Sequence, residues 1–99
     1  MGKALKDPEQ NETKHLHKFV DFAGKRVLEI GCGEGRLTWR YASASFLTVG
    51  IDPKQDALRV ASIDRPSDLS NKVHFVNSQA EHIPFSKEKF DIAILAWSL

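Results

Sequence analysis

Three glycines that alternate with other residues, Gly31, Gly33 and Gly35, form the part of this sequence best suited to holding a ligand. Glycine adopts positive φ angles that other residues avoid, and it has no side chain to keep a ligand away from the main chain. The apolar run from Val27 to Ile30 leads directly into these glycines. In open parallel sheets, ligands bind just beyond the carboxyl ends of the strands, where helix amino termini offer free N–H groups. The pattern indicates a ligand-binding turn between a strand and a helix, and the alternative is a similar turn without a ligand.

Glu29 is an acidic residue inside that apolar run. A parallel strand that is buried on both faces is normally apolar throughout, and a buried carboxylate without a partner is costly. The candidate partners within the protein are a lysine, an arginine or a set of backbone N–H groups. The functional alternative is an ammonium group of the ligand, reached directly or through water.

Asp52 and Arg36 indicate which nucleotide the turn would hold. Asp52 follows Gly31 by 21 positions, close to the offset of ~20 residues at which an acidic residue accepts hydrogen bonds from ribose hydroxyls. Because Asp52 precedes Pro53, capping of a helix that starts at the proline is an alternative role. Dinucleotide sites usually carry G-x-G-x-x-G, but Arg36 occupies the position of the last glycine. A nicotinamide cofactor is therefore less favoured.

Strands and helices alternate along the chain, which predicts an α/β domain with a mainly parallel sheet. The predicted strands cover residues 27–30, 46–51, 73–76 and 90–96. The predicted helices run from 12 to about 23, from about 37, and from 53 to just before 64, and 77–89 is largely loop. The glycines, Asp52, residues 77–80 and residues 96–98 all follow or end strands, so we expect them to converge on one edge of the sheet.

Four sequence blocks resemble, in order and spacing, the motif series of class I (Rossmann-like) S-adenosylmethionine-dependent methyltransferases. They are residues 27–35 (VLEIGCGEG), 50–53 (GIDP), 79–85 (QAEHIPF) and 90–95 (FDIAIL). The resemblance implies a Rossmann-like sheet in the order 3-2-1-4 with flanking helices, as the incomplete amino-terminal part of a seven-stranded domain. We expect residues 1–11 to be a mobile lead-in and residues 12–99 to be the amino-terminal half of a methyltransferase domain.

The resemblance also implies S-adenosyl-L-methionine as the cofactor and a role for each matching residue. The glycine turn would lie against the methionine part, with Glu29 helping to hold that end. Asp52 would bind the ribose hydroxyls, Pro53 would pack near the adenine, and the side chain of Gln79 and the backbone N–H of Ala80 would recognise the ring edge. Gln79 stands where the family often has an acidic residue, but its amide oxygen can still accept a hydrogen bond. The candidate cofactor contacts are Glu29, Gly31, Cys32, Gly33, Gly35, Asp52, Pro53, Gln79, Ala80 and Ala96.

Methyl transfer from a sulfonium is a direct displacement, so alignment in a dry pocket supplies much of the rate and no catalytic side chain is identified. We expect an unidentified small-molecule acceptor. A first alternative function is a non-catalytic module that binds a nucleotide or adenosylmethionine. A second is an NAD-dependent oxidoreductase fragment, which Arg36 disfavours.

Composition narrows the other possibilities. Fourteen basic and thirteen acidic residues are scattered along the chain, so we expect no nucleic-acid footprint. Cys32 is the sole cysteine and the histidines have no clustered partners, so we expect no disulfide and no metal site. Cys32 is expected to pack rather than to act as a nucleophile, although a nearby helix amino terminus could lower its pKa.

The apolar runs are too short to span a bilayer, so we expect a soluble cytoplasmic protein. The fourth strand would be an edge with only Asp91 as a charged residue near its start, and the sheet face opposite the helices would be poorly covered. We therefore expect the chain to self-associate.

Overall fold

The computed structural model describes residues 11–96, and its elements follow one another in the predicted order. The main elements are α1 (Asn11–Phe19), β1 (Arg26–Ile30), α2 (Thr38–Tyr41), β2 (Leu47–Asp52), α3 (Gln55–Asp64), β3 (Val73–Asn77) and β4 (Ile92–Leu95). Short 3-10 helices add η3 (Ser67–Leu69), η4 (Ala80–His82) and η5 (Lys87–Lys89). Residues 1–10 of the predicted lead-in lie outside the described residues, as do positions 97 and 98 at the predicted fourth strand end, and Asn11 begins α1.

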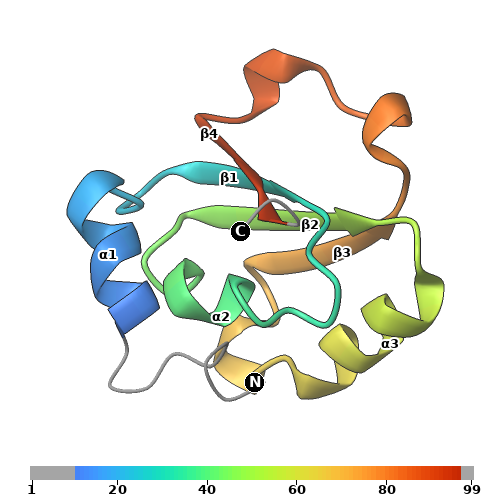
Figure 1. Cartoon of the computed structure of the whole chain (residues 1–99), viewed down its shortest axis with the longest axis horizontal. Coiled ribbons are helices and arrows are strands. Elements are labelled where there is room, and N and C mark those ends of the chain that lie inside the picture. The colour runs from blue at the N-terminus through green and yellow to red at the C-terminus, as the bar shows by residue number, and fades with distance from the viewer. Residues whose placement is uncertain (1–10, 97–99) are drawn as a thin grey trace.

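The four strands form one parallel sheet in the order β3-β2-β1-β4. The predicted fold class and strand order are therefore confirmed. Glu29 of β1 is opposite Gly50 of β2 and Ile94 of β4, and Asp52 of β2 is opposite Asn77 of β3. The parallel strands therefore end on the same side of the sheet (Figure 1).

Helices α1, α2 and α3 lie on one side of the sheet, and the segment between β3 and β4 lies on the other (Figure 1). Right-handed crossovers between parallel strands place consecutive helices on the same face. The core on the helical side includes Phe22, Val27, Leu37 and Tyr41, all buried. The rings of Phe22 and Tyr41 stack with centroids 4.6 Å apart, which joins the turn after α1 to α2.

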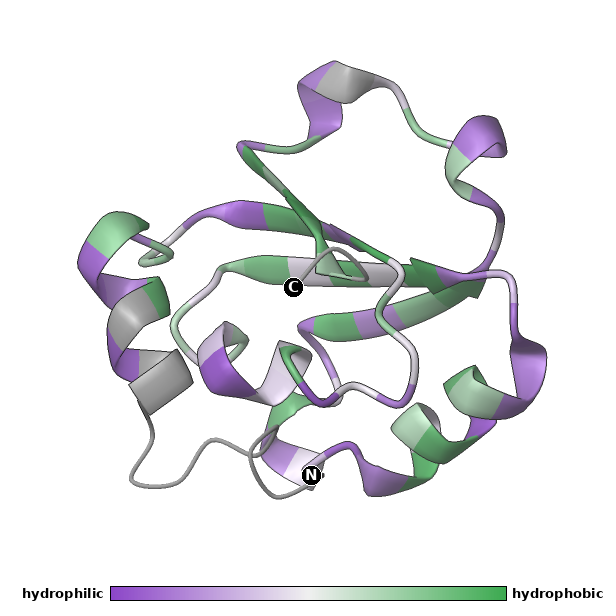
Figure 2. Ribbon diagram, in the orientation of Figure 1, coloured by the Kyte–Doolittle hydropathy of each residue, from purple (hydrophilic) through white to green (hydrophobic). Residues whose placement is uncertain are grey.

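The other face of the sheet is better covered than the sequence predicts. Leu28 and Ile30 of β1 are only 6% and 7% exposed. The residues packed over this face include Ile83, Phe85 and Phe90, from the segment predicted to be a loop and from the start of the predicted fourth strand. The expectation of a poorly covered face is therefore wrong for β1 and β2, because this segment carries apolar side chains back over them. Figure 2 shows hydrophobic residues along much of the strands.

The first helix ends earlier than its apolar pattern predicts. The predicted stripe continues to Ala23, but α1 ends at Phe19. The Asp21 carboxylate accepts a hydrogen bond from the Ala23 N–H at 3.1 Å, a local turn that competes with helix continuation. The turn releases Phe22 into the core, where it is 1% exposed.

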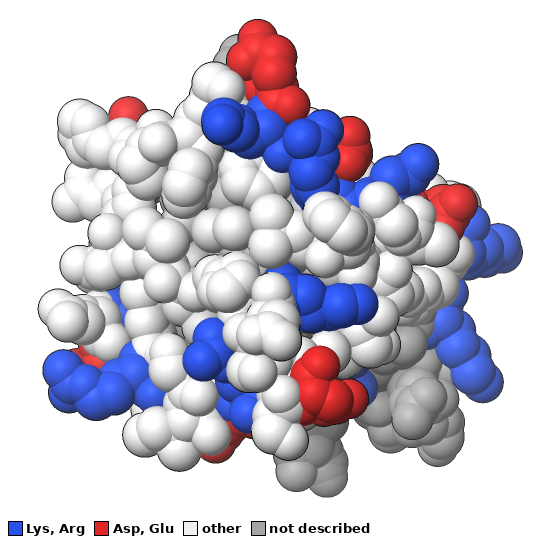
Figure 3. Space-filling view, turned by 180° about the vertical axis from the view of Figure 1, so that it is seen from behind, with Lys and Arg blue, Asp and Glu red and all other residues white. Residues whose placement is uncertain are grey.

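On the face seen from behind in Figure 3, acidic side chains lie next to several of the basic ones. No helix within residues 11–96 is long and apolar enough to cross a membrane.

Candidate cofactor site

The glycine turn has the conformation that its sequence predicts. The φ angles of Gly31, Gly33 and Gly35 are 82°, 56° and 90°, all in the region that favours glycine. The N–H groups of Gly31 and Cys32 donate to the Ile51 carbonyl at 2.8 and 3.1 Å, which ties the turn to the end of β2. A Cβ at Gly35 would lie 2.9 Å from the Trp39 ring, whereas a Cβ at Gly33 would have nothing within 4 Å. Open space therefore lies beside Gly33.

Asp52 joins this turn to the start of the next helix. Its Oδ2 accepts from the Gly33 N–H and its Oδ1 accepts from the Lys54 N–H, both at 2.8 Å. Two backbone donors hold the carboxylate in place, and each oxygen keeps a further lone pair for a ligand hydroxyl. The side chain does not cap α3: the helix begins at Gln55, and its N-cap is Lys54, without a side-chain cap bond. The prediction that Pro53 starts the helix is therefore wrong, and so is the alternative role of Asp52 as its cap.

The loop after β3 is tied to the same residue. The Asp52 carbonyl accepts from the Asn77 side-chain amide at 2.9 Å and from the Ser78 N–H at 3.2 Å. The Ser78 hydroxyl donates to the His82 carbonyl at 2.8 Å, and the His82 N–H donates to the Gln79 carbonyl at 3.0 Å. These bonds close residues 78–82 into a compact turn beside the end of β2.

The three strand ends surround a cavity of about 730 Å³, here called the strand-end cavity. Its volume lies in the range of roughly 300–1,000 Å³ that is usual for small-molecule sites. Six of the ten predicted cofactor contacts line it, namely Gly31, Gly33, Asp52, Pro53, Gln79 and Ala80. The lining residues that were not predicted are Glu34, Lys54, Ala57 and Glu81. All four lie within a few positions of a predicted residue in the sequence, and this closeness was the one sign that they could line the cavity.

The other four predicted contacts lie behind the cavity or away from it. Glu29 is fully buried in β1, and Cys32 is 5% exposed against Gly50, where a Cβ would lie 2.8 Å from the sulfur. Gly35 is buried against Trp39, and Ala96 packs against the core cluster that contains Phe22. The structure thus brings the predicted residues together at one sheet edge but places these four outside the cavity wall.

Comparison with known proteins agrees with this geometry. The profile of a family described as "Methyltransferase domain" matches residues 27–99, about three quarters of the chain. The chain belongs to this methyltransferase domain family. The matched span contains the glycine turn, Asp52 and the loop after β3.

Individual relatives match most of this chain but only part of their own length. The demethylmenaquinone methyltransferase of Lactococcus lactis is 24% identical over 90 residues, which cover 88% of this chain and 36% of that protein. Probable protein arginine N-methyltransferase 6.2 of Oryza sativa subsp. indica is 36% identical over 97 residues, covering 94% and 24%. A solved SAM-dependent methyltransferase from Methanosarcina mazei has a TM-score of 0.64 at 26% identity, covering 80% and 39%. The chain spans about a third of the length of the first curated relatives it matches.

In this methyltransferase domain, Glu29 connects β1 to α2. Its carboxylate accepts hydrogen bonds from the hydroxyls of Thr38 at 2.7 Å and Tyr41 at 2.6 Å. Burial, and then the negative charge of Glu29, raise the pKa of Tyr41 above its ordinary value, so its hydroxyl remains a donor. Hydroxyl groups were not among the partners expected from the sequence, because nothing in the pattern shows which α2 side chains turn toward β1.

The Cys32 thiol of the methyltransferase domain is not activated. Burial, followed by the negative charges of Glu29 and Asp52, raises the pKa of this thiol to about 12. The lowering that a nearby helix amino terminus could produce does not occur, and the thiol is protonated at neutral pH. Among residues 11–96, no three His, Cys, Asp or Glu side chains gather in a way that could hold a metal ion.

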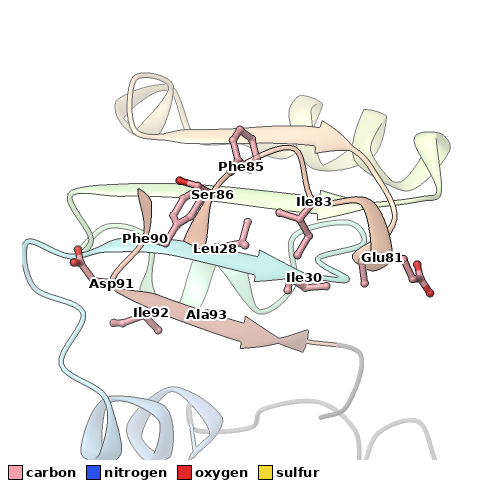
Figure 4. A pocket seen from close by; sticks show the side chains of 11 residues that line it. Leu28, Ile30, Glu81, Ile83, Phe85, Ser86, Phe90, Asp91, Ile92 and Ala93 are labelled. Carbon is pink, nitrogen blue, oxygen red and sulfur yellow. The ribbon is translucent and has the colours of Figure 1, made fainter. Parts of the chain in front are cut away.

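A second cavity, the sheet-face cavity, lies on the sheet face opposite the helices and has a volume of about 590 Å³. Figure 4 shows Leu28 and Ile30 of β1 and Ile92 of β4 beneath the segment that carries Ile83 and Phe85. It shares Ala80 and Glu81 with the strand-end cavity, but most of its wall is apolar. A ligand with a ribose and an amino acid needs fixed polar groups, and the strand-end cavity presents them.

Proposed function

We propose that this chain binds S-adenosylmethionine in the strand-end cavity and forms the cofactor-binding part of a methyltransferase. The observation that carries the proposal is the Asp52 carboxylate, held by two N–H groups at 2.8 Å beside a glycine turn that leaves open space at Gly33. A carboxylate oriented in this way is suited to accept from a pair of ribose hydroxyls. The family and the cofactor named for the Methanosarcina mazei relative support the same proposal.

The residues present fit this cofactor. Gly31 and Gly33 would face its methionine part, because a side chain at Gly33 would project into the open space. Asp52 would accept from the ribose, and Pro53 would pack near the adenine. Gln79 and the N–H of Ala80 would recognise the edge of the adenine ring from the opposite wall.

We propose that Glu29, Cys32, Gly35 and Ala96 act without lining the cavity. Glu29 holds α2 against β1 through Thr38 and Tyr41, and this contact supports the glycine turn from behind. Cys32 fills the space beneath Gly50, and Gly35 lets the Trp39 ring approach the turn. Ala96 continues β4 into the core beside Phe22.

S-adenosylmethionine supplies an electrophilic methyl group on a sulfonium. The contribution of this chain is to bind and orient the donor, so that an acceptor can approach the methyl in line with the sulfur. No residue is assigned as a general base. We propose a small-molecule acceptor, as the name of the demethylmenaquinone methyltransferase suggests, while the name of the rice relative points to protein arginine.

The proposal is tested by thermal unfolding of the chain with S-adenosylhomocysteine, S-adenosylmethionine or NAD, each at the same concentration. A ligand that binds only the folded state at about 100 times its dissociation constant stabilises that state by roughly 2.7 kcal/mol. We expect the two adenosyl compounds to raise the melting temperature and NAD to leave it nearly unchanged. A larger shift with NAD would favour an oxidoreductase fragment, and no shift with any of the three would contradict the proposal.

A further inference from the structure

Asn77 makes a contact that the cofactor site does not require for direct binding. Its side-chain amide donates to the Asp52 carbonyl at 2.9 Å, and the next residue, Ser78, donates its backbone N–H to the same oxygen at 3.2 Å. Asp52 and Asn77 are the last paired residues of β2 and β3. The side chain therefore adds a bond between the two strands at the point where their ladder ends.

The segment after Asn77 forms one wall of the strand-end cavity. Gln79, Ala80 and Glu81 line that cavity, whereas Asn77 lies in a separate hollow with Leu58 of α3. Because hydrogen bonds within residues 78–82 close this wall into a compact turn, its position depends on how its first residues are attached. The attachment reaches the Asp52 main chain, while the Asp52 side chain faces the cavity.

We infer that Asn77 is a positioning residue that sets the distance between the wall at Gln79 and Ala80 and the carboxylate of Asp52. This inference rests on the proposed function and gives Asn77 a part in cofactor selectivity. Asn77 fixes the position of the wall that would recognise adenine relative to Asp52, which would bind the ribose. The effect is transmitted through the wall, since Asn77 itself does not line the cavity.

The experiment compares dissociation constants for S-adenosylhomocysteine and for its inosine analogue, in which oxygen replaces the adenine amino group. The unmodified chain should prefer the adenine compound. Asn77→Ala should reduce that preference by roughly 3- to 10-fold, the range expected for one neutral hydrogen bond. A lower folded fraction alone would weaken both ligands equally and leave the preference unchanged.

Two further variants accompany this measurement. Asn71→Ala removes the side chain of another exposed asparagine, away from the cavity, and should leave both constants unchanged. Ser78→Ala removes the hydroxyl bond to His82, loosens the same wall without touching Asp52, and should reduce the preference as Asn77→Ala does. It provides the test if Asn77→Ala does not fold.

The outcomes separate this inference from the proposed function. If the unmodified chain binds neither compound, both are overturned. If it binds S-adenosylhomocysteine without preferring it, or if the Asn77→Ala variant keeps the full preference, the positioning role alone is overturned. Where Asn77→Ala does not fold, an unchanged preference in Ser78→Ala overturns it.

Discussion

At the scale of single residues, the site is built from groups that hold one another before a ligand arrives. Asp52 uses both carboxylate oxygens and its carbonyl to connect the turns that follow β1, β2 and β3. Preorganisation of this kind lowers the entropy that binding must overcome. The sequence predicted Asp52 from its offset to the glycines, but the backbone groups that orient it have no residue-type signature and became visible only in the structure.

The Cys32 thiol should react slowly with an alkylating reagent while the chain is folded. Since burial raises its pKa to about 12, iodoacetamide should label the folded chain far more slowly than the urea-unfolded chain at pH 8. In the unfolded chain the Cys32 thiol has its ordinary pKa of about 9, so it ionises at a lower pH than the folded chain's thiol. The stabilisation of the folded chain by its neutral thiol is therefore complete below about pH 9. It declines between about pH 9 and 12. Mass spectrometry measures the labelling over time. Equal labelling rates in the folded and unfolded chains would show that the thiol is accessible and ionised.

At the scale of secondary-structure elements, the buried contact between β1 and α2 joins the two elements that flank the glycine turn. The helix has only four residues, too few to be stable alone. Its position depends on contacts with the strand, and the buried bonds from Thr38 and Tyr41 to Glu29 are among them.

Removal of one hydroxyl tests this connection. Tyr41→Phe keeps the ring stacked on Phe22 but takes a donor from a buried carboxylate, which should cost about 1–3 kcal/mol in the free energy of unfolding. Urea denaturation measures the loss. Ser62→Ala, on an exposed position of α3, serves as the control and should change stability by less than about 0.5 kcal/mol. A Tyr41→Phe chain as stable as this control would show that the Tyr41 hydroxyl contributes little.

Elements differ in how far their sequence predicts them. The strand cores, with their continuous apolar residues, lie where expected, since a buried parallel strand has little choice of residue type. The carboxyl end of α1 and the start of α3 differ from the prediction because Asp21 and Asp52 form local side-chain bonds that end or delay a helix. Ile83 and Phe85 cover the sheet face opposite the helices. Their segment has no helical or strand periodicity, so the sequence pattern does not predict its path.

At the scale of the whole molecule, β4 is the edge of the described sheet next to β1. Ala93 is exposed on this strand and Leu95 is 50% exposed. Asp91, near its start, is already paired with Arg26, so its charge is partly neutralised there. An edge strand with few free charges favours pairing with another chain.

We therefore predict that the 99-residue chain self-associates as its concentration rises. Size-exclusion chromatography with light scattering should show a mass that increases with concentration. Ala93→Lys, which adds a charge to the exposed side of β4, should restore the monomer mass, whereas Ser70→Lys on an exposed position outside the strands should not. A monomer at every concentration for the unmodified chain would contradict this use of the edge.

Calorimetry of S-adenosylhomocysteine binding to an Asp52→Ala chain shows whether Asp52 binds the ribose of an adenosyl cofactor. Loss of charge-assisted hydrogen bonds worth roughly 1.5–3 kcal/mol should weaken binding by about 10- to 150-fold. Asp56→Ala is the matched control, because that carboxylate is 95% exposed and should leave the affinity unchanged. If Asp52→Ala folds and binds as tightly as the unmodified chain, Asp52 only joins the turns and the assignment of this cavity to the cofactor is wrong.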